Sequence, residues 1–295
     1  MVLSDSNEKP RETAAETDSL SALVDEAVAR ARRLFEEVRA TKKIPLAELR
    51  KELIPIVHEA ADGNQAIRLF ASLQGKEDYT YRHLVAVGAI SNLIGKWMGL
   101  GRQELLQLTT AALLHDVGKM AIPPSILNKP DKLTEEEYAL MKNHTVLGYE
   151  LIKETVGASH RQALVALQHH ERMDGSGYPF GITGPNIDLF SRIVAVADLF
   201  HAMASERVYR HPSPFYEVLS QMGKDAFGTL DPVVTRLFVE KTMSGLIGYP
   251  VRLTDGSEGI VLLIHTYDPT RPLVRTEDRF VDLSKDGSVQ IAQIL

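Results

Sequence analysis

Apolar residues recur at helical spacing through most of the first 245 residues, and the pattern changes after that point. The segment that starts at residue 21 carries apolar side chains on one helical face, at Val24, Val28, Ala31, Phe35 and Val38. From residue 77 to about 245, apolar helical patterns alternate with loops that contain Pro and Gly. Residues 246–295 contain short β-branched runs broken by Asp-Gly and Pro, which is typical of strands and turns. The chain is therefore predicted to be mainly α, with a helical bundle and a small C-terminal β appendage.

These patterns divide the chain into four parts. Residues 1–20 contain five acidic residues and few large apolar side chains, so they are predicted to form a disordered tail. Residues 21–76 are predicted to be an N-terminal helical region, and residues 77–245 the main helical domain. Residues 246–295 form the β appendage. Whether the N-terminal helices make a homodimer is left open by the sequence.

Length and composition narrow the class of protein. With 295 residues the chain can bury a sizeable core, and its net charge of -6 argues against nonspecific binding to polymeric nucleic acid or to an anionic membrane. No apolar run approaches the roughly 18 residues of a membrane span, and the N-terminus lacks the apolar core of a signal peptide. We therefore expect a soluble, cytoplasmic protein. The absence of cysteine means that any metal must be held by histidine and carboxylate.

Histidines and aspartates recur along the predicted bundle at intervals of about 25 to 32 residues. Each interval matches one helix and its return loop, so a bundle could bring these residues together around one pocket. The candidates are His83, His115, Asp116, His144, His169, His170 and Asp198. Five imidazoles and two carboxylates are enough for two ions. If Asp116 bridged them at roughly 3.5 to 4 Å, the site would suit hydrolysis of a phosphate ester by a metal-bridging hydroxide.

Each of these residues alone also has a purely structural interpretation. A single His83 or His144 on a part-apolar helix is more often a packing residue than a ligand. Neighbours on a helix point about 100° apart, so His169 and His170 converge on one metal only near a helix end. Asp198 lies within IVAVADLF, where a carboxylate is normally paired or metal-bound. The ordered occurrence of all seven residues is what favours a metal centre.

Motifs across residues 77–245 strengthen this interpretation. They are DYTYRH, AALLHDVGKMAIPPSILNKPDKLTEEE, KNHTVLGYELI, HHERMDGSGYPFGI, RIVAVADLFHAM and SERVYR. Together they resemble the HD-GYP subgroup of the HD-domain metal-dependent phosphohydrolases, whose members hydrolyse cyclic di-GMP. The resemblance implies a cyclic di-GMP phosphodiesterase that produces linear pGpG, with continuation to GMP left open. It also implies two divalent transition-metal ions, iron or manganese, with zinc as an alternative in vitro.

The resemblance assigns the candidate ligands to two metal sites by position. It places one ion among His83, His115, Asp116 and Asp198, and the other among Asp116, His144, His169 and His170. Asp116 would bridge the ions, and Asp116 and Lys119 are the predicted catalytic residues. Some members hold a third metal with a carboxylate one turn before the first histidine. Here that position is Tyr79, with Asp78 one residue away, so two metals are favoured.

The remaining motif residues resemble the family's substrate contacts, which are Lys119, Tyr178, Arg207 and Arg210. Because cyclic di-GMP is dianionic and the chain has a net charge of -6, positive potential has to be focused at the site. Arg207 and Arg210 would share a helical face, although a solvated surface pair is the structural alternative. Gly175 and Gly177 would let the backbone turn tightly beside the ligand.

One position departs from the family pattern. The family usually places a second acid three residues after the metal-binding Asp, and this chain has His201 there. Weakened activity, altered nucleotide preference and no effect all stay open at this point. The departure also supports a second interpretation, in which the domain is a low-turnover sensor of a cyclic dinucleotide or a protein-interaction module. A phosphohydrolase for another nucleotide is less favoured, because DGSGYP and SERVYR accompany activity on cyclic dinucleotides.

Overall fold

The computed structural model describes residues 14–62, 66–75, 77–205, 215–225 and 228–295. The predicted substrate contacts Arg207 and Arg210 lie outside these residues, as does the predicted tail up to residue 13. The first helix begins at Ala14, so residues 14–20 are helical although they were expected to belong to the tail. This stretch is rich in Ala and Glu, which favour helix, and Leu20 packs against the core.

Helices dominate the described chain, as predicted. They are α1 (Ala14–Thr41), α2 (Leu46–Glu48), η1 (Leu49–Leu53), α3 (Ile54–Ala60), α4 (Ala66–Ser72), α5 (Tyr79–Trp97), α6 (Arg102–Leu114), η2 (Val117–Ala121), α7 (Pro124–Leu127), α8 (Glu135–Lys142), α9 (His144–Lys153), α10 (His160–Gln168), η3 (Gly184–Asn186), α11 (Leu189–Ala204), α12 (Phe215–Asp225) and α13 (Pro232–Ser244). Several starts follow local chemistry, because Thr134, Ser159, Asp188 and Asp231 each accept a hydrogen bond from a backbone N–H of the first turn.

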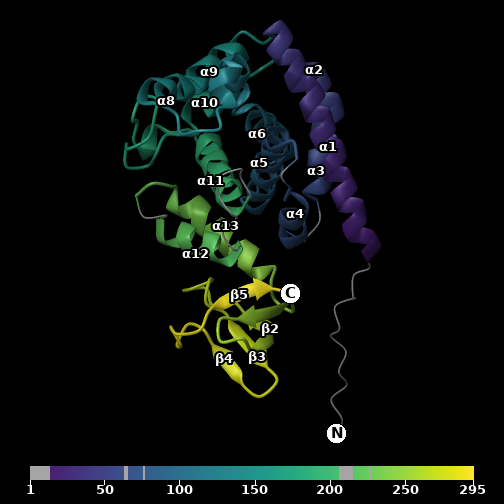
Figure 1. Ribbon diagram of the computed structural model, residues 1–295, viewed down its shortest axis with the longest axis vertical. Helices are drawn as coiled ribbons and strands as arrows, with labels where there is room; N and C mark the ends of the chain where they lie inside the picture. Colours follow the sequence, from purple (N-terminus) through teal and green to yellow (C-terminus); the bar gives the residue numbers. More distant parts are fainter. Residues whose placement is uncertain (1–13, 63–65, 76, 206–214, 226–227) are drawn as a thin grey trace.

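The centre of the bundle is α5, around which α1, α6 and α11 pack (Figure 1). This helix is apolar on nearly all sides, and residues such as Ala86, Ile90 and Ile94 are completely buried. A helix that is hydrophobic all round needs partners on every face, which explains its central place. On the other side of α6, α9 and α10 pack against each other and η2 packs on α9. Through these contacts, helices that are distant in sequence lie side by side in the bundle.

The N-terminal helix is part of the same core. Its apolar stripe of Val24, Val28, Ala31, Phe35 and Val38 is buried against neighbours that include α3, α5 and η2 of the same chain. A homodimer through the N-terminal helices stays a prediction, and it would have to use the outer face of α1 because the apolar face is already covered.

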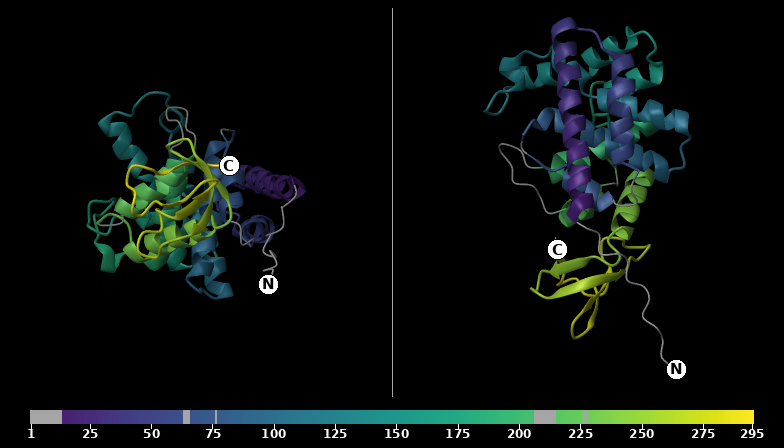
Figure 2. Two further views of the ribbon diagram at one scale, coloured as in Figure 1. Left: turned by 90° about the horizontal axis from the view of Figure 1, so that it is seen from below. Right: turned by 90° about the vertical axis from the view of Figure 1, so that its right-hand side faces the viewer.

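The C-terminal unit, residues 246–295, is a small antiparallel sheet with strand order β4-β3-β2-β1-β5, as predicted for this part of the chain. Its strands are β1 (Pro250–Leu253), β2 (Glu258–Leu263), β3 (Leu273–Thr276), β4 (Phe280–Asp282) and β5 (Ile291–Ile294). Val261, Val274 and Val281 pair across three strands on the buried face. The sheet lies at one end of the bundle, beyond α12 and α13 in Figure 1, and the right-hand view of Figure 2 shows it at the same end. Among the described helices, none combines the length and the apolarity that a membrane crossing requires.

Candidate metal centre

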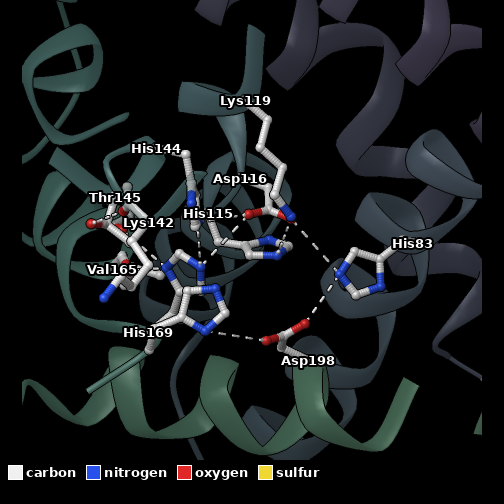
Figure 3. A network of polar contacts seen from close by, with 12 residues as sticks. His83, His115, Asp116, Lys119, Lys142, His144, Thr145, Val165, His169 and Asp198 are labelled. Carbon is white, nitrogen blue, oxygen red and sulfur yellow. Dashed lines mark hydrogen bonds and ion pairs between the residues drawn. The ribbon is translucent and has the colours of Figure 1, made fainter. Parts of the chain in front are cut away.

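The seven candidate ligands come from five places in the bundle and converge on one region. Figure 3 labels six of them, all except His170. His83 lies on α5 and Asp198 on α11, while His115 and Asp116 form the junction of α6 and η2. His144 is the first residue of α9. Helix α10 ends at Gln168, and His169 and His170 follow it directly. The pair therefore sits at a helix end, the one place where adjacent imidazoles can turn to the same side.

The ligand atoms form two groups, and within each group they all lie within 4.8 Å of one another. The first group is His83, His115 and Asp198. The second group is Asp116, His144, His169 and His170. These groups match the two ligand sets expected from the sequence, apart from the place of Asp116.

Asp116 lies between the two groups and turns one carboxylate oxygen to each. Its Oδ2 lies 3.3 Å from Nε2 of His115 and 3.9 Å from Nε2 of His83, in the first group. Its Oδ1 lies 3.2 Å from Nε2 of His144 and 3.7 Å from Nε2 of His169, in the second group. This is the arrangement in which one carboxylate can bridge two ions.

The donor set fits a metal centre on a second observation. Among the described residues, His115 Nε2 and Asp116 Oδ1 are buried and make no well-aligned hydrogen bond, although His115 Nε2 lies 3.3 Å from Asp116 Oδ2 and Asp116 Oδ1 lies 3.2 Å from His144 Nε2. Leaving a buried polar atom without a partner costs about 1 to 3 kcal/mol, and a cation that took these lone pairs would remove that cost. Imidazole and carboxylate donors without thiolate suit iron, manganese or zinc.

Both aspartates are held in the charged form. Burial opposes ionisation of Asp116, but Lys119 and His115 outweigh burial and hold the pKa of this carboxyl well below its usual range. Burial likewise opposes ionisation of Asp198, while His83, whose Nε2 lies 3.1 Å from this carboxylate, leads the effects that lower its pKa well below the usual range. The two carboxylates, Asp116 buried and Asp198 partly buried, therefore face the imidazoles as anions, the form that binds cations.

Burial favours the neutral form of three of the imidazoles. Burial lowers the pKa of His83, lowers that of His169 to about 4, and lowers that of His170 well below its ordinary value. His115 differs from these three, because the charge of Asp116 outweighs the effect of burial and raises its pKa. A neutral imidazole has a lone pair for a metal, so burial prepares three of these rings as ligands.

Two of the predicted substrate contacts lie beside the centre. The Lys119 ammonium pairs with Oδ2 of Asp116, and its side chain remains 25% exposed, so it can be reached from solvent. The Tyr178 ring stacks on His170 with ring centroids 4.7 Å apart. Burial raises the pKa of Tyr178, which keeps its phenol neutral. Sequence reasoning missed Lys142, whose Nζ lies 5.8 Å from the centre of the Tyr178 ring.

The loop that carries Tyr178 is built on two glycines and a buried acid. Gly175 has a φ of +82°, and a Cβ on Gly177 would lie 2.5 Å from backbone atoms of residues 170–172. Both positions therefore need glycine. The Glu171 carboxylate accepts hydrogen bonds from the N–H groups of Phe180 at 2.8 Å and Ile182 at 3.1 Å. Sequence reasoning missed Glu171, because nothing local shows that this acid is buried and closes the loop.

Tyr79 and Asp78 lie at or next to the position where some family members have a carboxylate for a third metal, and here both side chains contact other residues. The Tyr79 ring stacks on that of His83, with centroids 5.8 Å apart. Asp78 pairs with Arg32 on α1 at 3.2 Å. The preference for two ions over three stays a prediction.

Comparison with known proteins gives the same picture. The sequence matches the family described as HD domain over residues 23–234. A cyclic di-GMP phosphodiesterase of Pseudomonas aeruginosa is 34% identical over 242 residues, which cover 82% of this chain and 58% of that protein. A cyclic di-GMP phosphodiesterase response regulator of Xanthomonas campestris is 45% identical over 147 residues, which cover 48% of this chain and 38% of the relative. The chain thus spans about half the length of these relatives.

The fold has a counterpart among solved structures. An HDG"Y"P protein from Bdellovibrio bacteriovorus superposes with a TM-score of 0.58 at 19% sequence identity, over 79% of this chain and 74% of that one. At this identity the likeness concerns the fold alone, and it confirms the predicted fold class.

Proposed function

Because the chain belongs to the HD-domain family, we propose that it is a metal-dependent phosphodiesterase that hydrolyses cyclic di-GMP to linear pGpG. The observation that carries this proposal is the Asp116 carboxylate, whose two oxygens face two separate groups of imidazoles. The relatives named as cyclic di-GMP phosphodiesterases support the choice of substrate. We propose that this activity is located in the cytoplasm. A dianionic nucleotide does not cross a bilayer, so the enzyme has to share the compartment of its substrate.

Two divalent ions, iron or manganese, complete the centre in this proposal. The first group together with Asp116 would hold one ion, and the second group would hold the other. When bound, the ions supply Lewis-acid polarisation of the phosphate and a water nucleophile at neutral pH.

The chain's own residues then have separate tasks. Asp116 and Asp198 are charged, so without counter-charge they would repel a dianionic substrate. Lys119 supplies positive charge at the edge of the centre, and in this proposal a substrate phosphate takes over part of its contact with Asp116. Tyr178 lines the site from its place against His170. Arg207 and Arg210 are proposed to bind the second phosphate.

Anaerobic purification followed by elemental analysis and a turnover assay tests the proposal. We expect about two ions per chain and conversion of cyclic di-GMP to pGpG, which chromatography of the reaction mixture would detect. In Arg207→Ala and Arg210→Ala, loss of a charge-assisted phosphate contact should weaken binding about tenfold to a hundredfold at unchanged metal content. If protein with a full complement of metal binds cyclic di-GMP without cleaving it, the result would contradict the proposed enzymatic function and favour the sensor interpretation.

A further inference from the structure

A second imidazole lies behind His83, outside the set of predicted ligands. Nε2 of His83 lies 3.1 Å from Oδ1 of Asp198 and faces the centre (Figure 3). Nδ1 of His83, on the other side of the ring, lies 3.0 Å from Nδ1 of His201. His201 is 2% exposed and follows Asp198 on α11 by one helical turn. One helix therefore presents both a candidate ligand and the residue that backs His83.

The other buried ligands show what such a partner does. Their Nδ1 atoms lie against backbone carbonyl oxygens, for His115 at 2.7 Å from Ala112, for His144 at 2.7 Å from Met141 and for His169 at 3.0 Å from Ala166. A carbonyl only accepts hydrogen bonds, so Nδ1 carries the proton and Nε2 presents its lone pair to the centre. For His83 this partner is the ring of His201, which can either donate or accept.

We propose that His201 is a positioning residue that keeps His83 in the tautomer whose Nε2 lone pair faces the metal. His201 Nδ1 then accepts the hydrogen bond from Nδ1–H of His83, which leaves the His201 proton on Nε2. That Nε2 lies 3.0 Å from Oγ of Ser205, which accepts the bond. Ser205 is 3% exposed, so water does not compete for this contact.

This role explains why the position tolerates a departure from the family pattern. An ionised acid at residue 201 could only accept the hydrogen bond of His83, and a neutral imidazole with its proton on Nε2 can accept the same bond. The His201 ring lies on the side of His83 remote from the centre, so it acts through His83 and not on the substrate. The inference rests on the proposed function only in treating the first group as a metal site.

Two variants of similar side-chain shape separate the hydrogen bond from packing. His201→Asn places an amide oxygen near the position of the imidazole Nδ1 and keeps an acceptor for His83. His201→Leu has the same branching and no acceptor. Both lose the contact with Ser205, so they are matched in that respect. We expect His201→Leu to weaken metal binding to the first group about tenfold to a hundredfold, and His201→Asn to stay within about threefold of the unmodified protein.

The measurement is an anaerobic titration of each metal-free protein with Mn²⁺, followed by elemental analysis after dialysis. The Leu variant should retain about one ion per chain, in the second group, while the Asn variant and the unmodified protein retain about two. Thermal unfolding of each metal-free protein reports whether the fold is kept.

Each outcome decides the inference. Equal metal affinity in the Leu and Asn variants overturns it, because the acceptor then has no role, and so does an unmodified protein that binds no ion in the first group. If the predicted pattern of metal binding is found in a protein that does not cleave cyclic di-GMP, the positioning role stands and only the proposed function fails.

Discussion

Carboxylates with lowered pKa values occur in both the helical domain and the C-terminal β unit, but for different reasons. In the bundle, Asp116 is buried and the Asp198 side chain is only 14% exposed. Burial opposes their ionisation, but Lys119 and His115 outweigh it for Asp116, and His83 from another helix leads the effects that outweigh it for Asp198. In the β unit, Asp255 and Asp286 are exposed, and the hydroxyl of the serine two residues later lowers the pKa of each. A lowered carboxylate pKa therefore does not by itself mark a functional site. Burial combined with convergence from several elements does.

Histidine shows the same contrast. In the β unit, His265 Nε2 pairs with Oδ1 of Asp282 at 3.0 Å, and Ser284 and Lys285 of the same turn also contact that carboxylate. In the bundle, imidazoles from different helices face carboxylates of other helices. Among the described residues, both groups that could hold a metal lie in the helical domain.

The largest difference between the two regions, in metal content and turnover, should appear when one aspartate in each region is replaced by alanine. Asp116→Ala removes the oxygens that face both groups, so metal content should fall from about two ions to well below one, and turnover by about a thousandfold or more. Asp255→Ala removes an exposed carboxylate whose partners, Ser257 and Arg279, both lie in the β unit, and both ions and activity should be kept. Elemental analysis and the turnover assay check this. A full metal complement in Asp116→Ala would contradict the bridging role.

A smaller effect is expected from adding one methyl group in each region. A Cβ at Gly118 would lie 1.9 Å from the carbonyl oxygen of His144 and 2.5 Å from the N atom of Gly148, so η2 and α9 would have to separate. Gly118→Ala should lower the free energy of unfolding by about 1 to 3 kcal/mol or more and weaken metal binding by the second group. At Gly287 in the β unit a Cβ meets nothing within 4 Å, and Gly287→Ala should change stability by less than about 0.5 kcal/mol.

Urea unfolding of these two glycine variants and the unmodified protein measures the difference. Equal midpoints for Gly118→Ala and Gly287→Ala would show that η2 and α9 are not in close contact.

The smallest effect concerns acid stability of the metal-free protein. Burial lowers the pKa of His169 from 6.5 to about 4, so between these pH values the unfolded chain binds a proton that the folded chain does not. Stability of the bundle should therefore fall as pH drops from 6.5 towards 4. His83 and His170 act in the same direction, and His115 offsets part of the effect.

The β unit should respond in a lower pH window. The pKa values of Asp255 and Asp286 are lowered from 3.8, so their contribution is present above that pH and is lost only as pH falls below it. Hydrogen exchange at pH 7, 6, 5 and 4, resolved by peptide, separates the two regions. Loss of protection in both regions at the same pH would remove the distinction.

The sequence by itself determined the helical class, the β appendage and the identity of the candidate ligands. Apolar periodicity is local, and metal donors are recognised by residue type, so both can be read along the chain. The sequence also contained the condition for the His169-His170 pair, because adjacent imidazoles converge only at a helix end and α10 ends at Gln168.

Tertiary structure alone decided how these residues are used. It placed the two oxygens of Asp116 towards different groups, His201 behind His83, Glu171 under the Tyr178 loop and the stripe of α1 inside the shared core. Each of these facts depends on the rotation of one helix relative to another that is distant in sequence. Spacing along the chain determines which side of its own helix a residue occupies, whereas only packing determines what that side meets.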